Sequence, residues 1–176
     1  MAVAVITGVS RRIGIGAAVA RRLAEAGWDL FLHSWSPHDA EQPWGADPEG
    51  AAAIVADLRT RVRVEHLVAD LADPDAPAQL VAAAEGAYGR VDALVANHAR
   101  SSAATLEELT AAELDLTYAV NTRATLLLVK EFAARCPGPG RVVLMTSGQH
   151  RGPMLADRTM TGALDHHLWA ASKQRG

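Results

Sequence analysis

The sequence predicts an α/β fold, a doubly wound parallel sheet of five strands in the spatial order 3-2-1-4-5. Five short runs are almost entirely apolar, helical patterns separate them, and a turn with several glycines follows the first run. Strands that are apolar on both sides need helices on both faces, which is typical of parallel sheets with right-handed crossovers. The 176 residues suit a single domain, so residues 1–176 are expected to share one core.

The first strand and the turn after it organise the rest of the chain. Residues 3–6 form an apolar run, and Ile15, Val19 and Leu23 recur every four residues, which predicts a helix from Gly16 to Gly27. Glycines between a strand and a helix let the backbone approach a pyrophosphate at the positive helix N-terminus. Glycine also serves any tight turn, so the pattern alone leaves a purely structural role open.

Alternating strands and helices follow. Residues 29–33 are predicted to form the second strand, 51–60 a helix, 62–68 the third strand and 75–88 a helix that Gly89 ends. Residues 34–50, with prolines and two tryptophans, are predicted to be a long surface loop, and loops of this length are usually functional or mobile.

The second half continues in the same way. Residues 91–97 are the predicted fourth strand, and Thr110 with Glu113 forms a plausible capping box for a helix that runs through Asn121 to about residue 134. The prolines and glycines at 137–140 end that helix, and residues 141–147 are the predicted fifth strand.

Composition narrows the function classes. A net charge of −3 gives no reason to expect nucleic acid as a partner, and one cysteine, Cys136, excludes an internal disulfide framework. No apolar run approaches the ~20 residues that span a bilayer. The chain enters its first strand at once, without space for a signal peptide. A soluble cytoplasmic protein is therefore expected.

The glycine turn resembles that of the classical short-chain dehydrogenase/reductase family, in particular its 3-oxoacyl-carrier-protein-reductase-like members. The family motif is T-G-x-x-x-G-I-G. Either Arg12 replaces the middle glycine, or the loop is two residues longer and Gly14-Ile15-Gly16 is the family triplet. The longer loop is favoured because it leaves the usual helix length. The resemblance implies a Rossmann-type NAD(P)-binding domain whose cofactor contacts in this turn are Gly8, Ser10, Arg11, Arg12, Gly14, Ile15 and Gly16.

The strand ends extend the resemblance, and ligands of open α/β sheets lie beyond these ends. Asp70-Leu71 follows the third strand, where the family's Asp bonds the adenine amino group. A turn-forming or capping Asp is equally compatible with the position. Asn97 opens A-N-H-A-R, which is similar to the family's N-N-A-G with His98 and Arg100 as departures, although Asn is also a good turn former.

The resemblance also implies a catalytic set. Asn121 would support a proton-relay water, and Ser147 would bond the substrate carbonyl. The family's Tyr-x-x-x-Lys follows its Ser by about thirteen residues, but position 160 here is Met. The nearest match is Trp169-Ala-Ala-Ser-Lys173, in which Lys173 would hold the nicotinamide ribose and Trp169 replaces the Tyr that acts as general acid. An indole N–H cannot exchange a proton near neutral pH.

Cofactor and substrate follow from the same comparison. The second strand ends His33-Ser34-Trp35 without the acid that binds the ribose hydroxyls of NAD, while Arg11 and Arg12 would lie near a 2′-phosphate, so NADP is expected. The expected substrate is a small carbonyl compound or acyl thioester, with no membrane partner. A metal site is not expected, because His150, His166 and His167 are more simply surface residues.

Three hypotheses remain. The first is an NADP-dependent oxidoreductase that transfers hydride to a carbonyl such as a 3-oxoacyl thioester. The second is a catalytically impaired nucleotide-binding module, and the third is a truncated, non-functional family member. Members of the family continue for two further strands and a substrate-covering loop beyond the length of this chain. A homo-oligomer is possible but weakened, because the helix carrying Lys173 ends soon after it begins.

Overall fold

The computed structural model describes residues 1–101, 105, 107–136 and 138–146. Its centre is a single sheet of five strands in the order β3-β2-β1-β4-β5, and every neighbouring pair is parallel. The strands are β1 (Val3–Ile6), β2 (Asp29–Ser34), β3 (Val64–Val68), β4 (Ala93–Ala96) and β5 (Arg141–Leu144). The predicted strand order is therefore confirmed.

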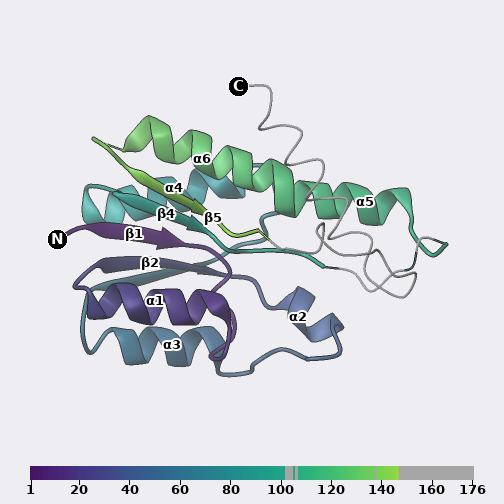
Figure 1. Cartoon of the computed structure of the whole chain (residues 1–176), viewed down its shortest axis with the longest axis horizontal. Coiled ribbons are helices and arrows are strands. Elements are labelled where there is room, and N and C mark those ends of the chain that lie inside the picture. The colour runs from purple at the N-terminus through teal and green to yellow at the C-terminus, as the bar shows by residue number, and fades with distance from the viewer. Residues whose placement is uncertain (102–104, 106, 137, 147–176) are drawn as a thin grey trace.

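Helices cover both faces of the sheet (Figure 1). One face carries α1 (Ile15–Glu25) and α3 (Gly50–Leu58), and the other carries α4 (Ala76–Tyr88) and α6 (Ala124–Arg135). Ala4 and Ile6 of β1 pack in the core of the first face, whereas Val5 packs in the core of the second. Each residue of β1 is buried on one face or the other, which explains why its sequence shows no polar alternation.

The two helix ends predicted from glycine are confirmed. Gly27 follows α1 with φ +78°, and Gly89 caps α4 with φ +73°. Both angles lie in the left-handed region that glycine enters without a steric penalty. None of the helices in the described part of the chain is long and apolar enough to cross a membrane.

The predicted loop at residues 34–50 needs a correction, because it contains a short helix, α2 (Pro37–Glu41). Proline lies in the first turn of this helix, where its missing N–H and fixed φ carry no cost. The short helix lies beyond the carboxyl end of β2, on the α1 side of the sheet (Figure 1).

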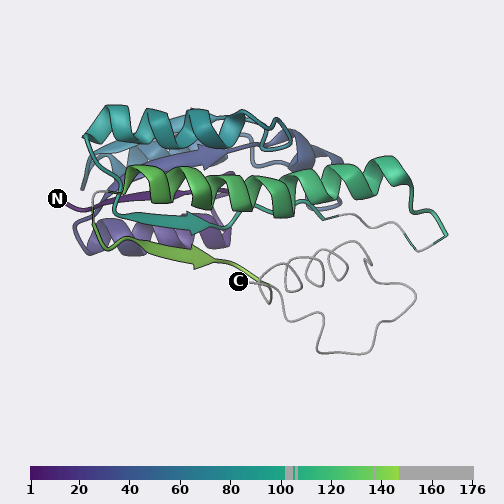
Figure 2. The ribbon, with the colours of Figure 1, turned by 90° about the horizontal axis from the view of Figure 1, so that it is seen from above.

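The predicted helix through Asn121 is not a uniform α-helix. It consists of α5 (Ala111–Tyr118), a π-helical turn η1 (Ala119–Arg123) and then α6. Thr110 caps α5 as predicted, since its hydroxyl oxygen accepts the Glu113 N–H at 3.2 Å. The three segments form one rod, and α5 projects past the carboxyl edge of the sheet (Figure 2). Turns of the π type are frequent at functional sites.

Candidate nucleotide-binding cleft

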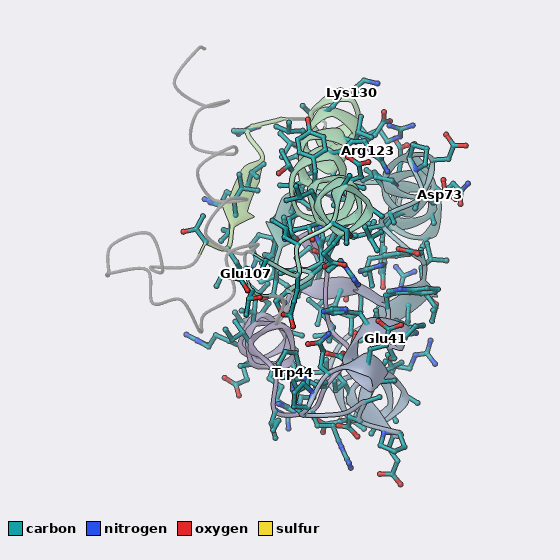
Figure 3. The ribbon with its side chains drawn as sticks, turned by 90° about the vertical axis from the view of Figure 1, so that its right-hand side faces the viewer. Glu41, Trp44, Asp73, Glu107, Arg123 and Lys130 are labelled. Carbon is teal, nitrogen blue, oxygen red and sulfur yellow. The ribbon has the colours of Figure 1, made fainter. Side chains whose placement is uncertain are left out.

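A cleft of about 600 Å³ lies at the carboxyl ends of the strands. Figure 3 looks onto this edge, with Glu41 and Trp44 from the segment after β2 on one side and Asp73 and Arg123 on the other. The predicted cofactor residues that line the cleft are Gly8, Ser10, Arg11, Gly14, Ile15, Asp70, Leu71 and Asn97. The folding of the chain thus brings together residues from the ends of β1, β3 and β4.

The geometry of the turn requires glycine at Gly8 and Gly16. A Cβ on Gly16 would lie 2.5 Å from the carbonyl oxygen of Gly8, and Gly8 itself has φ +73°. Gly14 is the N-cap of α1, so the N-terminal N–H groups of that helix open beside the cleft. This arrangement favours the longer-loop register, with Gly14-Ile15-Gly16 as the triplet.

Asn97 ties the end of β4 to the glycine turn. Its side-chain amide donates to the carbonyl oxygens of Thr7 (3.2 Å) and Gly8 (3.1 Å). Its backbone N–H donates to the Thr7 hydroxyl oxygen at 3.0 Å. Asn97 therefore has a specific bracing role, beyond that of a general turn former.

His33 connects the same turn to the end of β3. Its Nδ1 accepts the Gly8 N–H at 3.3 Å, and its Nε2 lies 2.9 Å from the carbonyl oxygen of Ala69. Because Nδ1 accepts a hydrogen bond, Nε2 carries the proton and donates it to Ala69. Burial lowers the pKa of His33 to about 4, so the ring is neutral near pH 7.

Asp70 forms a hydrogen bond within the turn after β3, which is the turn-forming role that the sequence left open. Its Oδ1 accepts the Ala72 N–H at 2.8 Å. A carboxylate has two oxygens, so this bond is compatible with a ligand contact at the second oxygen. Leu71 is buried next to it and contributes to the wall of the cleft.

The two arginines of the turn point to different surroundings. Arg11 lines the cleft, and its guanidinium carbon lies 5.7 Å from the centroid of the Trp44 ring. Arg12 forms ion pairs with Asp47 (2.9 Å) and Glu49 (2.8 Å) instead, and it is not among the described residues that line the cleft. The pKa of Asp47 is lowered, mainly by the hydrogen bond from Arg12.

The second wall of the cleft comes from residues that sequence reasoning left unassigned. Arg100 donates to His38 Nδ1 and to Glu113 Oε2, both at 2.9 Å, and so connects α2 with α5. Burial, followed by the nearby Arg100 charge, lowers the pKa of His38. Trp35, His38 and Trp44 line the cleft and lie in the predicted loop. The length of that loop and its tryptophans were the features of the sequence that could have indicated a functional role.

Asn121 lies within η1 and is bonded to the backbone of Arg100. Its Oδ1 accepts the Arg100 N–H at 2.7 Å, and its Nδ2 donates to the Arg100 carbonyl oxygen at 2.8 Å. The Asn121 side chain therefore braces the cleft wall through a paired contact. Ser147, Trp169 and Lys173 lie outside the described residues.

Two histidines of the site escaped assignment as well. His33 is a polar residue in a mostly apolar strand, and His98 departs from the family motif. Each is therefore an unusual residue for its position, which could have indicated a specific role. Within the described ranges, no three His, Cys, Asp or Glu side chains gather closely enough to hold a metal ion.

Comparisons with known proteins agree with this geometry. The protein-family model described as short chain dehydrogenase matches residues 2–156 of this chain. An uncharacterized oxidoreductase of Bacillus subtilis, YjdA, is 35% identical over 179 residues, which cover 98% of this chain and 68% of that protein.

Two solved structures are similar throughout the fold. A short chain dehydrogenase from Burkholderia cenocepacia in complex with NADP is 32% identical, with a TM-score of 0.81 over 96% of this chain and 63% of its own. A 3-oxoacyl (acyl-carrier-protein) reductase from Agrobacterium tumefaciens with NADP bound is 28% identical, with a TM-score of 0.77 over 97% of this chain and 61% of its own. This chain therefore spans less than two thirds of either structure.

Proposed function

The chain belongs to the short-chain dehydrogenase family, and from this premise we propose that it is an NADP-dependent oxidoreductase acting on a carbonyl group. The proposed substrate class is a 3-oxoacyl thioester or a similar small carbonyl compound. The NADP complexes of two structurally similar proteins support this cofactor.

The observation that carries the proposal is the composition of the cleft. A turn without space for a Cβ on Gly8 or Gly16, the N-terminus of α1 and the Asp70 and Asn97 segments all meet at one cavity of about 600 Å³. Helix N-termini and close-packed glycines suit a pyrophosphate. The residues present therefore fit a dinucleotide, and by the family resemblance Asp70 would contact the adenine and Arg11 would contact the 2′-phosphate.

The catalytic roles are assigned by family resemblance. NADPH, when bound, supplies a hydride. Ser147 would polarise the substrate carbonyl, Lys173 would hold the nicotinamide ribose, and Asn121 would support a water that relays protons. The general acid would be missing if Trp169-Ala-Ala-Ser-Lys173 takes the place of the family's Tyr-x-x-x-Lys, because an indole cannot deliver a proton.

Trp169 is also the reason to retain a second candidate function, a nucleotide-binding module without turnover. Loss of a positioned acid lowers a rate by roughly 10²–10⁴-fold. The two candidates share the cofactor site and differ only in the chemistry that follows binding.

The test uses the purified 176-residue chain. Calorimetric titration with NADPH is expected to show binding, and oxidation of NADPH is then followed with a 3-oxoacyl thioester and a simple diketone. Weak turnover that Trp169→Tyr increases would support the oxidoreductase. Binding without turnover in either form would favour the module, and absence of NADPH binding by the folded chain would overturn both.

A further inference from the structure

We infer that His98 is a positioning residue for Asn121, because its imidazole holds the π-helical turn η1 in the shape that presents the Asn121 side chain to the cleft wall. The inference rests on the proposed function in so far as Asn121 belongs to the catalytic set. It concerns the residue at which this chain departs from the family's N-N-A-G motif.

The imidazole of His98 joins the end of β1 to η1. Its Nδ1 lies 2.7 Å from the Thr7 hydroxyl oxygen, and its Nε2 lies 3.0 Å from the carbonyl oxygen of Val120. The Thr7 oxygen already accepts the backbone N–H groups of Asn97 (3.0 Å) and His98 (3.2 Å). Its own hydrogen has two acceptors within reach, Nδ1 at 2.7 Å and the Val95 carbonyl oxygen at 3.4 Å, and the shorter contact makes Nδ1 the acceptor.

An acceptor at Nδ1 fixes the tautomer of the ring. A neutral imidazole has one donor and one acceptor nitrogen, so Nε2 carries the proton and donates it to Val120. A charged ring would carry a hydrogen on Nδ1 as well as on Nε2, so Nδ1 could no longer accept the Thr7 hydroxyl. Burial agrees with the neutral form, since it lowers the pKa of His98 to about 3.

The π turn changes which backbone N–H groups reach its carbonyl oxygens, and the donor at Nε2 compensates at Val120. In an α-helix the Ala124 N–H would donate to Val120. Here it donates to Ala119, five residues back, and His98 donates to the Val120 carbonyl oxygen instead. The next carbonyl oxygen, of Asn121, accepts the Thr125 hydroxyl at 2.8 Å. Side chains thus supply donors to two successive carbonyls of the turn.

The segment after β4 contacts η1 twice. His98 bonds Val120, and two residues later the backbone of Arg100 makes its paired bonds of 2.7 and 2.8 Å with the Asn121 amide. Two contacts on consecutive residues of η1 fix the rotation of the turn about its axis. Loss of the His98 contact would remove the attachment at Val120 and leave the contacts of Asn121 with Arg100.

Two conservative substitutions separate the two ends of the ring. In His98→Gln the side-chain amide reaches the position of Nε2, so the donor to Val120 is retained and the contact with Thr7 is lost. In His98→Asn the shorter amide reaches the position of Nδ1, so the contact with Thr7 is retained and the donor to Val120 is lost. Both variants keep a polar side chain, and they differ in whether the contact with Val120 or the contact with Thr7 is retained.

The experiment measures hydrogen exchange of the Arg100 N–H by nuclear magnetic resonance in the full chain. We expect His98→Asn to accelerate this exchange by about tenfold or more, the size of one lost buried hydrogen bond, and His98→Gln to leave it close to the parent rate. Asn121→Ala, which removes the acceptor of the Arg100 N–H, sets the upper limit. Unchanged exchange in His98→Asn, or equal acceleration in both His98 variants, would overturn the inference.

The unsubstituted chain gives a measurement that needs no variant to fold. Nitrogen chemical shifts of the His98 ring should show the proton on Nε2 throughout the range from about pH 7 to 5. A proton on Nδ1, or a charged ring at pH 6, would contradict the donor to Val120. If the exchange of the Arg100 N–H behaves as expected but the chain does not bind NADPH, the proposed function is overturned. The positioning of Asn121 by His98 would still stand.

Discussion

The side-chain amide of Asn97 donates to the carbonyl oxygen of Gly8 at 3.1 Å. This bond packs the end of β4 against the glycine turn and leaves no space for a side chain on Gly16. A Cβ there would lie 2.5 Å from the Gly8 oxygen and 2.8 Å from the Asn97 amide nitrogen. Close approach of two backbone segments is therefore the physical origin of the glycine motif at this site.

Gly16→Ala should open this contact and destabilise the chain by about 1–3 kcal/mol, as overpacking does, and NADPH affinity should fall with it. Gly86→Ala is the matched control. No described atom lies within 4 Å of a Cβ on Gly86, which is inside α4, so the change should stabilise by about 0.5–1 kcal/mol. Urea unfolding of both variants checks the signs, and a stable Gly16→Ala chain with normal affinity would contradict the packing argument.

Asn97→Asp should be more damaging than Asn97→Ala. The alanine leaves the Thr7 and Gly8 carbonyl oxygens without their donor, at a cost of about 1–3 kcal/mol. The aspartate has the same shape but brings a negative charge against those oxygens. Its destabilisation should shrink at low pH, where the carboxyl is protonated and can donate. Equal stability of the Asp variant and the parent at pH 7 would refute the assigned donor direction.

Acid should destabilise the fold through His33 and His98. Their pKa values, about 4 and about 3, lie below the unfolded value of about 6.5, so the unfolded chain binds more protons and stability falls as pH drops below 6.5. At pH 5 the loss is about 2 kcal/mol for each neutral histidine. Urea unfolding at pH 7.5 and 5 measures it. His98→Gln should show a smaller pH dependence than the parent, and an identical slope would exclude a contribution from His98.

Elements whose chemistry is local could be predicted from the sequence. The buried strands, the glycine helix ends and the meeting of Asp70 and Asn97 at the strand ends all follow from apolar pattern, backbone freedom and the geometry of parallel sheets. Non-local pairing could not be read in this way. Arg12 forms ion pairs with Asp47 and Glu49, which lie 35 and 37 residues away, and no local rule separates it from its neighbour Arg11.

The π turn illustrates the same limit. A helix through Asn121 is apparent from the sequence, but the change of hydrogen-bond spacing at Ala119–Arg123 coincides with a histidine from another strand end and a threonine one turn later. The threonine is a local partner, but His98 lies 22 residues before Val120 and reaches it through the fold. The sequence showed that His98 departs from the family motif, but it did not indicate that His98 donates to the Val120 carbonyl oxygen.

The two arginines of the glycine turn should differ in cofactor discrimination. Arg11 faces the cleft beside Trp44, whereas the Arg12 guanidinium is held by two carboxylates. Loss of a charged hydrogen bond to a 2′-phosphate weakens binding by roughly tenfold or more, and NADH lacks that phosphate. Arg11→Ala should therefore weaken NADPH binding by about that factor and leave NADH binding nearly unchanged.

Arg12→Ala is the control for Arg11→Ala, since it removes the same charge one residue away. Its ion pairs connect the turn to the segment before α3, so its loss should affect NADPH and NADH to the same small extent. Calorimetric titration of both cofactors against both variants gives four affinities. A selective loss of NADPH binding in Arg12→Ala, with Arg11→Ala unaffected, would mean that Arg12 leaves its carboxylate partners to bind the phosphate, and would reverse the assignment.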